Sequence, residues 1–203
     1  FMAINGDILN GVYSLTTEAT TYDVGQRPGN SNFTSVFFDS SANSPAILND
    51  ITNTEFVGCW FSGGRTGAGF AGCQLQQTDS LTFTNCRFFN CGSHGVSSGS
   101  TSARTTFIGC KADSNGRVAA SSAGFHFATC SNWQMIGCRS RNGLFPGGAQ
   151  TVGISINGAS SSGWRVIGGD VTGNVTQGVF NESTQGTFTD VVGYVNNRRV
   201  VAT

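Results

Sequence analysis

Phe56-Val57-Gly58-Cys59 is the first copy of a four-residue phrase that recurs along the chain. The later copies are Phe83-Thr84-Asn85-Cys86, Phe107-Ile108-Gly109-Cys110, Met135-Ile136-Gly137-Cys138 and, with the cysteine lost, Val166-Ile167-Gly168-Gly169. At the fourth position, successive copies are 27, 24, 28 and 31 residues apart. Such a period is typical of stacked repeats rather than of a single globular core. The chain is therefore predicted to be a solenoid.

A second phrase, a glycine followed by an apolar residue, keeps step with the first. Its copies are Gly69-Phe70, Gly95-Val96, Gly124-Phe125, Gly153-Ile154 and Gly178-Val179. The segments between the phrases are short and rich in Phe, Val, Ile and Thr, which favours strands over the long apolar periodicity of a helical solenoid. The sequence thus predicts an all-β fold in which each coil of a parallel β-helix is one repeat.

The repeat predicts a single β-helix domain over residues 51–192. Residues 1–50 contain strand-like runs without the phrase, and we expect atypical coils leading into the stack. Residues 193–203 are expected to leave the stack as an extended segment. The start, Phe1-Met2-Ala3, lacks the pattern of a secretory signal, and we expect the chain to be a piece of a longer product.

The composition excludes several classes of protein. Charged residues make up only 11% of the 203 residues and the net charge is zero, yet 16 phenylalanines are available for burial, so disorder is not expected. Eleven Lys and Arg balance eleven Asp and Glu, which argues against nucleic acid as a partner. No apolar run is long enough to insert into a membrane.

The seven cysteines are predicted to be core residues rather than a disulfide framework. Their number is odd, and four of them share one position of the repeat, so they would stack as an internal ladder of free thiols. Disulfides along that ladder are conceivable but geometrically awkward, and free thiols imply assembly in a reducing compartment. We predict no metal site and no cofactor, because Cys-x-x-Cys is missing and His94 and His126 occupy different positions of the repeat.

The residue after each cysteine must point outward, because the cysteine and the residue two places on point inward. This outward column holds Trp60, Arg87, Lys111, Arg139 and Asp170. An aromatic ring offers a flat apolar face to a sugar, and three stacked cations could follow an acidic polysaccharide. Trp60, Arg87, Lys111 and Arg139 are therefore the predicted binding strip, with a solvated charged face as the alternative.

Asp113 and Asp170 are the candidate carboxylates for glycoside hydrolysis, which needs two across the scissile bond. They lie two coils apart on neighbouring outward columns. Inter-coil ion pairs, Asp113 with Arg141 and Asp170 with Arg139, explain both residues better. The catalytic residues, if the chain has any, stay unknown.

Two further patterns predict structural devices. The adjacent apolar residues that precede the glycine of the first phrase are expected to mark a corner between two sheets, where both side chains reach the core. An asparagine follows each strand and is expected to bond the coils above and below. These asparagines are Asn90, Asn115, Asn142 and Asn174.

With its "F-x-G-C…N-G…G-Φ" coil, the chain resembles the right-handed single-stranded parallel β-helix (solenoid) of pectin-lyase type, in particular the tailspikes and tail fibres of bacteriophages. The resemblance covers about residues 50 to 203. It implies a homotrimer in the virion, on the phage tail with other tail proteins, assembled in the bacterial cytoplasm and acting at the host cell surface. It also implies recognition of bacterial surface polysaccharide, often with cleavage by a hydrolase or lyase.

Three functions remain open on the sequence. The first is a tailspike or tail-fibre β-helix that recognises host polysaccharide and acts as a depolymerase. The second is a non-catalytic structural shaft or receptor-binding module of the phage tail. The third, a free-standing bacterial enzyme of pectin-lyase type, is disfavoured by the thiol ladder and the missing signal sequence.

Overall fold

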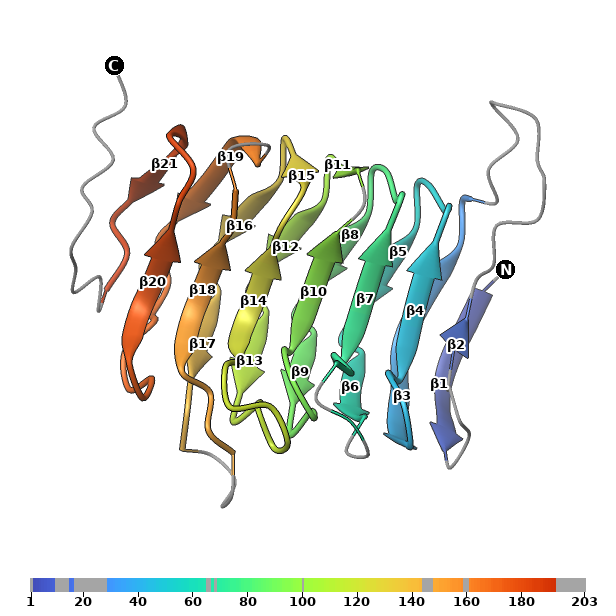
Figure 1. Cartoon of the computed structure of the whole chain (residues 1–203). Helices are drawn as coiled ribbons and strands as arrows, with labels where there is room; N and C mark the ends of the chain where they lie inside the picture. Colours follow the sequence, from blue (N-terminus) through green and yellow to red (C-terminus); the bar gives the residue numbers. More distant parts are fainter. Residues whose placement is uncertain are drawn as a thin grey trace.

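The computed structural model is a parallel β-helix, in which strands stack coil upon coil along one axis (Figure 1). It describes residues 2–9, 15–16, 29–64, 67, 69–99, 101–143, 148–158 and 161–192. All regular elements within these ranges are strands, and none of the described residues forms a helix suited to crossing a membrane. The fold class predicted from the sequence is confirmed. The predicted tail, residues 193–203, lies outside the described residues.

One face of the helix is a seven-stranded parallel sheet, in which each coil contributes one strand (Figure 1). Its strands, in order, are β2 (Leu15–Thr16), β4 (Ala46–Asn49), β7 (Cys73–Gln76), β10 (Val96–Gly99), β14 (Ala123–Phe127), β18 (Val152–Ile156) and β20 (Gln177–Asn181).

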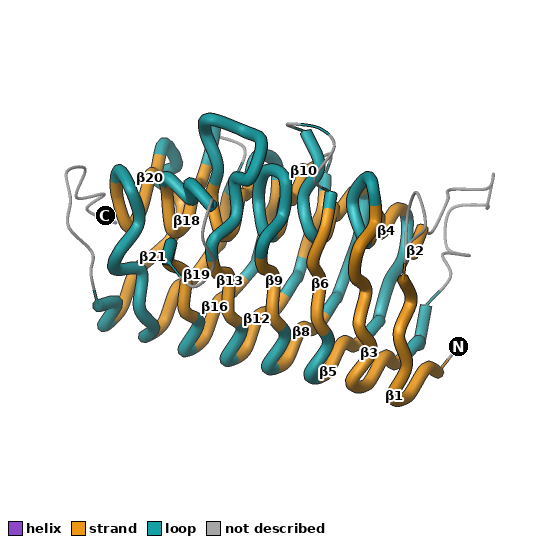
Figure 2. Tube along the Cα trace, turned by 90° about the horizontal axis from the view of Figure 1, so that it is seen from below, coloured by secondary structure: helices purple, strands orange, loops and turns teal. Residues whose placement is uncertain are grey.

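The second sheet has fourteen strands and bends into two further faces (Figure 2). The first stacks β5 (Glu55–Val57), β8 (Thr82–Thr84), β12 (Thr106–Ile108) and β16 (Gln134–Ile136), and the second stacks β6 (Trp60–Gly63), β9 (Arg87–Phe89), β13 (Lys111–Asp113) and β17 (Arg139–Arg141). The remaining strands are β1 (Met2–Leu9), β3 (Asn32–Ser41), β11 (Ser102–Ala103), β15 (Cys130–Ser131), β19 (Ser162–Ile167) and β21 (Gln185–Thr189). The long strand β3 pairs with both β5 and β6, so the stack includes a coil before residue 51.

The first phrase forms the corner between these two faces. Its third residue has left-handed backbone, with φ of 63° at Gly58 and 54° at Asn85, which suits glycine and asparagine. Phe107 is buried, whereas Ile108 is exposed. The predicted corner is therefore real, but the expectation that both apolar side chains reach the core is wrong. Strand alternation continues up to the corner, and the left-handed residue then turns the chain so that the cysteine points inward.

The second phrase marks the inward positions of the seven-stranded sheet. Val96 pairs in register with Phe125 of the next coil and with Cys73 of the preceding one. The first copy of the phrase is thus Gly72-Cys73 rather than the predicted Gly69-Phe70. A Cβ at Gly72 would lie 2.7 Å from both Cys91 Sγ and the carbonyl oxygen of Gly95, so this site requires glycine.

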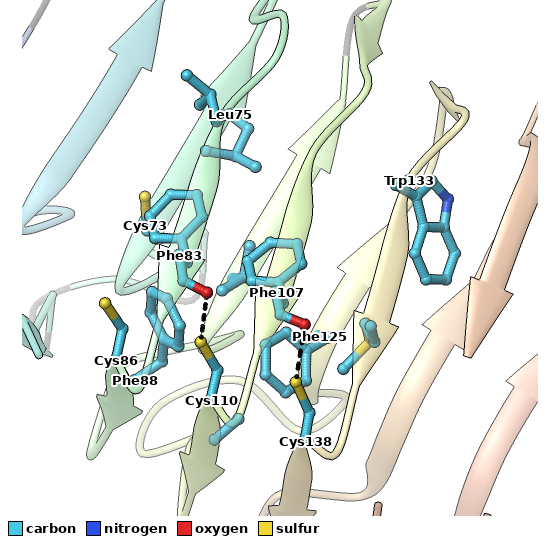
Figure 3. Packing of buried hydrophobic residues seen from close by; sticks show 14 of the residues in the cluster. Cys73, Leu75, Phe83, Cys86, Phe88, Phe107, Cys110, Phe125, Trp133 and Cys138 are labelled. Atoms are coloured by element: carbon cyan, nitrogen blue, oxygen red, sulfur yellow. Dashed lines mark hydrogen bonds between the residues drawn. The ribbon is translucent and has the colours of Figure 1, made fainter. Parts of the chain in front are cut away.

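The core consists of stacked columns of like side chains (Figure 3). The rings of Phe56, Phe83 and Phe107 stack at centroid distances of 4.8 and 5.1 Å. Beside them the Cys110 thiol donates to the carbonyl oxygen of Phe83 at 3.2 Å (Figure 3). All seven cysteines are free and buried, which confirms the predicted thiol ladder.

Candidate functional site

The predicted binding strip forms one continuous outward column. Trp60, Arg87, Lys111 and Arg139 are successive register partners on β6, β9, β13 and β17, and Asp170 follows as a bridge partner of Arg139. The column also begins one coil earlier than predicted, because Phe37 of β3 pairs with Trp60. Sequence reasoning missed Phe37 because its coil lacks the cysteine phrase, although the apolar residues on either side of it, Val36 and Phe38, are both buried in the core.

The aromatic end of the strip is a compact cluster around Trp60. Its ring is 38% exposed and meets Phe37 and Phe89 edge to face, at 4.8 and 5.5 Å between centroids. The Arg87 guanidinium lies 5.0 Å from the Trp60 ring centroid and 5.2 Å from that of Phe89. These are cation–π contacts, which hold the arginine in place without neutralising its charge. A flat apolar surface thus adjoins a positioned cation.

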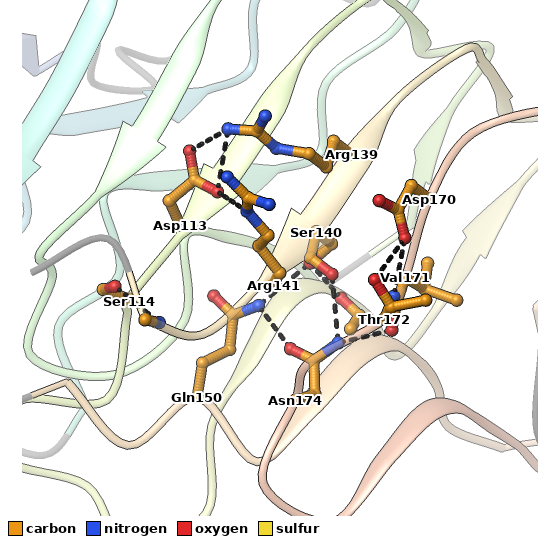
Figure 4. Close-up of polar contacts among 12 residues, drawn as sticks. Asp113, Ser114, Arg139, Ser140, Arg141, Gln150, Asp170, Val171, Thr172 and Asn174 are labelled. Carbon is orange, nitrogen blue, oxygen red and sulfur yellow. Dashed lines mark hydrogen bonds and ion pairs between the residues drawn. The ribbon is translucent and has the colours of Figure 1, made fainter. Parts of the chain in front are cut away.

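The cationic end contains a buried carboxylate. Asp113 is 1% exposed, and its Oδ2 lies 3.1 Å from Arg139 Nη2, while its Oδ1 lies 3.8 Å from Arg141 Nε (Figure 4). Cations stacked at strand spacing repel one another, and the carboxylate between two of them offsets that cost. The ion-pair interpretation of Asp113 is confirmed, with Arg139 as an additional partner. Lys111, two residues before Asp113 on the same strand, remains exposed.

Asp170 behaves differently from the expected inter-coil pair. Its Oδ1 accepts hydrogen bonds from the Thr172 hydroxyl at 2.7 Å and from the Thr172 amide at 2.9 Å (Figure 4). These bonds, and more weakly the charges of Arg141 and Arg139, lower the pKa of Asp170. The predicted ion pair with Arg139 is therefore wrong, because Arg139 is already engaged by Asp113. Catalytic roles for Asp113 and Asp170 stay predictions.

The asparagines that follow the strands divide between two neighbouring positions. Asn115 Nδ2 donates to Gln150 Oε1 at 2.9 Å. Gln150 Nε2 in turn donates to Asn174 Oδ1 at 2.8 Å (Figure 4). Asn115 and Asn174 thus bond across coils as expected, but a glutamine completes the chain. Asn90 accepts from Arg117, and Asn142 Oδ1 is buried without a hydrogen-bond partner within the described ranges. Asn90 therefore bonds the next coil as expected, although its partner is an arginine, and the expectation is wrong for Asn142.

A cleft of about 470 Å³ lies on the outward side of the seven-stranded sheet, and sequence reasoning missed it. His94 and His126 line it with their rings stacked, 4.3 Å between centroids. His126 has Ser97 as its register partner on the preceding coil, so the two histidines do occupy different positions of the repeat, as predicted. The loop after β9 nevertheless places the His94 ring against the His126 ring. Among the described residues, no group of three or more His, Cys, Asp or Glu could hold a metal ion.

The stacked parallel coils define a single-stranded parallel β-helix. Solved structures with the same fold superpose on the chain. Tailspike protein 3 of bacteriophage CBA120 superposes with a TM-score of 0.73 at 19% identity, covering 95% of this chain and 33% of the tailspike. The periplasmic alginate epimerase AlgG superposes with a TM-score of 0.66 at 11% identity, covering 82% of this chain and 40% of the epimerase. The chain thus spans a third to two-fifths of their lengths.

These likenesses establish the fold. No protein-family model matches the chain, and no curated protein matches it significantly in sequence. Fold alone does not carry an activity, so function must be argued from the surfaces described above.

Proposed function

We propose that the chain is the β-helix segment of a phage tailspike or tail fibre and binds a bacterial surface polysaccharide. The fold shared with the CBA120 tailspike supports the class of protein. The observation that carries the binding role is the unbroken column from Trp60 through Arg87 and Lys111 to Arg139.

The chemistry of the binding strip suits an acidic polysaccharide. Coils repeat every ~4.8 Å, so the column presents positive charge at a regular interval along an extended polymer. The Trp60 face can pack against the apolar side of a sugar ring, and the Arg87 guanidinium beside it can bind a carboxylate. Lys111 supplies an exposed charge one coil further on.

The proposed assembly is a homotrimer on the phage tail, with other virion tail proteins as partners, that acts at the host cell surface. Assembly in the bacterial cytoplasm is consistent with seven free, buried thiols, since a reducing compartment keeps thiols unpaired.

We further propose that the chain cleaves the polysaccharide it binds. A non-catalytic shaft or receptor-binding module of the phage tail is the second candidate. One observation favours the second: Asp113 is enclosed by Arg139 and Arg141, which leaves it poorly placed to exchange protons with a substrate. Incubating the purified chain with capsule or O-antigen of the host separates the two. Shortening of the polymer supports an enzyme, and retained binding without shortening supports the binding module.

The binding strip itself is tested with alginate, polygalacturonate and hyaluronate as acidic polymers and dextran as a neutral one. We expect salt-sensitive binding of an acidic polymer that weakens several-fold in Trp60→Ala and in Lys111→Ala. Ile108→Ala is the matched control, because Ile108 is exposed on a different column. Binding that is unchanged in both strip variants, or absent for every acidic polymer, would overturn the strip.

A further inference from the structure

The cleft on the seven-stranded sheet is built from outward side chains of adjacent coils. His126, Ser155 and Phe180 are register partners on β14, β18 and β20, which lie side by side (Figure 1). The loop residues Ser121 and Ser122 and Gln177, the first residue of β20, contribute to its walls. With His94 from the coil of β10, the lining comes from four stacked coils, so the cleft is not the product of one irregular loop.

The two imidazoles have fixed orientations. Their planes are parallel within 9°, and His94 Nδ1 accepts a hydrogen bond from the Ala123 amide at 2.9 Å. The proton of neutral His94 must therefore reside on Nε2, which is a donor. Burial lowers the pKa of His94 to about 3, with His126 contributing, and burial also lowers the pKa of His126, so both rings are neutral at pH 7.

His126 carries an unused polar atom. Its Nδ1 is buried and has no hydrogen-bond partner among the described residues, although it belongs to a ring that lines the cleft. A buried polar atom without a partner is costly, so a turn of the imidazole that brings Nδ1 to the cleft wall would let a bound hydroxyl supply the interaction that the protein leaves unmade. The nitrogen lone pairs of two stacked rings lie in separate, nearly parallel planes, so they do not converge on one metal ion.

The remaining lining is polar but uncharged. Ser155, the register partner of His126, donates its hydroxyl to Asn157 Oδ1 at 2.8 Å, which orients the Asn157 amide in the cleft wall. Phe180 is 38% exposed and supplies an aromatic surface at one end of the column. None of the described residues lining the cleft is Asp, Glu, Lys or Arg. Hydroxyl, amide and imidazole groups beside an exposed ring match a neutral sugar, whereas an anion would find no cation here.

We propose that this cleft is a second carbohydrate site, specific for an uncharged sugar unit, in which Phe180 packs against the ring and His94, His126 and Asn157 bind its hydroxyls. The inference deepens the proposed function, because it assigns the acidic and neutral parts of a polysaccharide to different faces of the β-helix. The binding strip lies on β6, β9, β13 and β17, so the two sites can be tested separately.

The test uses the chain's only two histidines. Imidazole carbon–proton signals are followed by NMR while glucose, galactose, mannose, N-acetylglucosamine or rhamnose is added. We expect at least one neutral sugar to shift the signals saturably, and galacturonate to do so more weakly. The response should fall several-fold in Phe180→Ala, and His126→Phe, which keeps the stacked ring but removes both nitrogens, should weaken the response of His94 similarly.

Val175→Ala is the matched control, since Val175 is an exposed apolar residue outside the cleft. The inference is overturned if no neutral sugar moves either signal, or if Phe180→Ala responds as the unmodified chain does. Trp60→Ala should leave the imidazole response intact. If Trp60→Ala loses acidic-polymer binding but no neutral sugar shifts the imidazole signals, the cleft proposal alone is overturned. If neutral sugars shift the imidazole signals but Trp60→Ala binds acidic polymers as the unmodified chain does, the binding strip alone is overturned.

Discussion

Asp113 accepts a hydrogen bond from Arg139 of the next coil at 3.1 Å while only 1% of its own side chain is exposed. The acid is thus buried in the face that carries the predicted binding strip, and it ties two coils together through charge.

Replacing Asp113 by Asn should lower the free energy of unfolding by about 1–3 kcal/mol, because hydrogen bonds to charged groups are lost and two arginines keep an unbalanced charge. The matched control is Asp79→Asn, whose partner Arg104 is largely exposed, and this change should cost at most about 1 kcal/mol. Urea unfolding of both variants measures the difference. Equal losses would show that the buried pair contributes no more than a surface pair.

Close packing of backbone between coils predicts a position-specific glycine effect. A Cβ at Gly95 would lie 2.6 Å from the Gly124 carbonyl oxygen and 2.8 Å from Asn115 Nδ2, whereas a Cβ at Gly99 meets nothing within 4 Å. Gly95→Ala should destabilise the chain by about 1–3 kcal/mol. Gly99→Ala should be neutral or stabilise it by about 0.4–1 kcal/mol. Thermal unfolding of the two variants tests this, and a similar melting temperature for both would contradict it.

The stacked histidines predict acid lability. Folded His94 stays neutral down to about pH 3, whereas an unfolded histidine takes up a proton near pH 6.5. The unfolded state therefore binds more protons between these values, so stability is complete above pH 6.5 and falls as the pH decreases, by up to about 1.4 kcal/mol per pH unit.

His94→Asn removes the titration and can keep an acceptor for the Ala123 amide. Urea midpoints measured from pH 7 to pH 4 should fall less steeply in this variant than in the unmodified chain. Parallel curves would argue against the neutral, buried state of His94.

The thiol ladder predicts slow chemical modification. All seven cysteines are buried, and burial raises the pKa of Cys130 to about 11 and also raises the pKa of Cys110. The hydrogen bond with Cys86 instead lowers the pKa of Cys59, so burial alone protects that thiol. The folded chain should not react with Ellman's reagent at pH 8, whereas the chain in denaturant should release seven equivalents. Fast reaction of any thiol in the folded chain would place that cysteine at the surface.

Several features followed directly from the pattern of residues. The cysteine phrase repeats where the backbone bends and a small side chain points inward, so counting from it identified the outward column from Trp60 to Arg139. The same count predicted the ion pair between Asp113 and Arg141, because Arg141 is the register partner of Asp113 on the next coil. Strand alternation and strand spacing are local rules, which is why they could be read from the chain alone.

Other features depended on loops of unequal length. The three glycines near residue 70 made the start of β7 ambiguous, and only strand pairing selected Gly72. The partner of Asn115 is Gln150, a residue with no repeating position, which the loop before β18 brings into the network.

The sequence by itself determined the architecture. A short phrase with a small inward cysteine and an outward residue after it recurs every 24 to 31 residues, and such a period is typical of stacked parallel strands. Only the tertiary structure decided which residues from different loops and coils lie together on the surface. His94 and His126 stack because a loop of particular length displaces one ring onto the other, and the cleft beside them exists because Ser155 and Phe180 continue that column on later coils. Loop conformation follows no period along the chain, so neither the stacked pair nor the cleft left a pattern in the sequence.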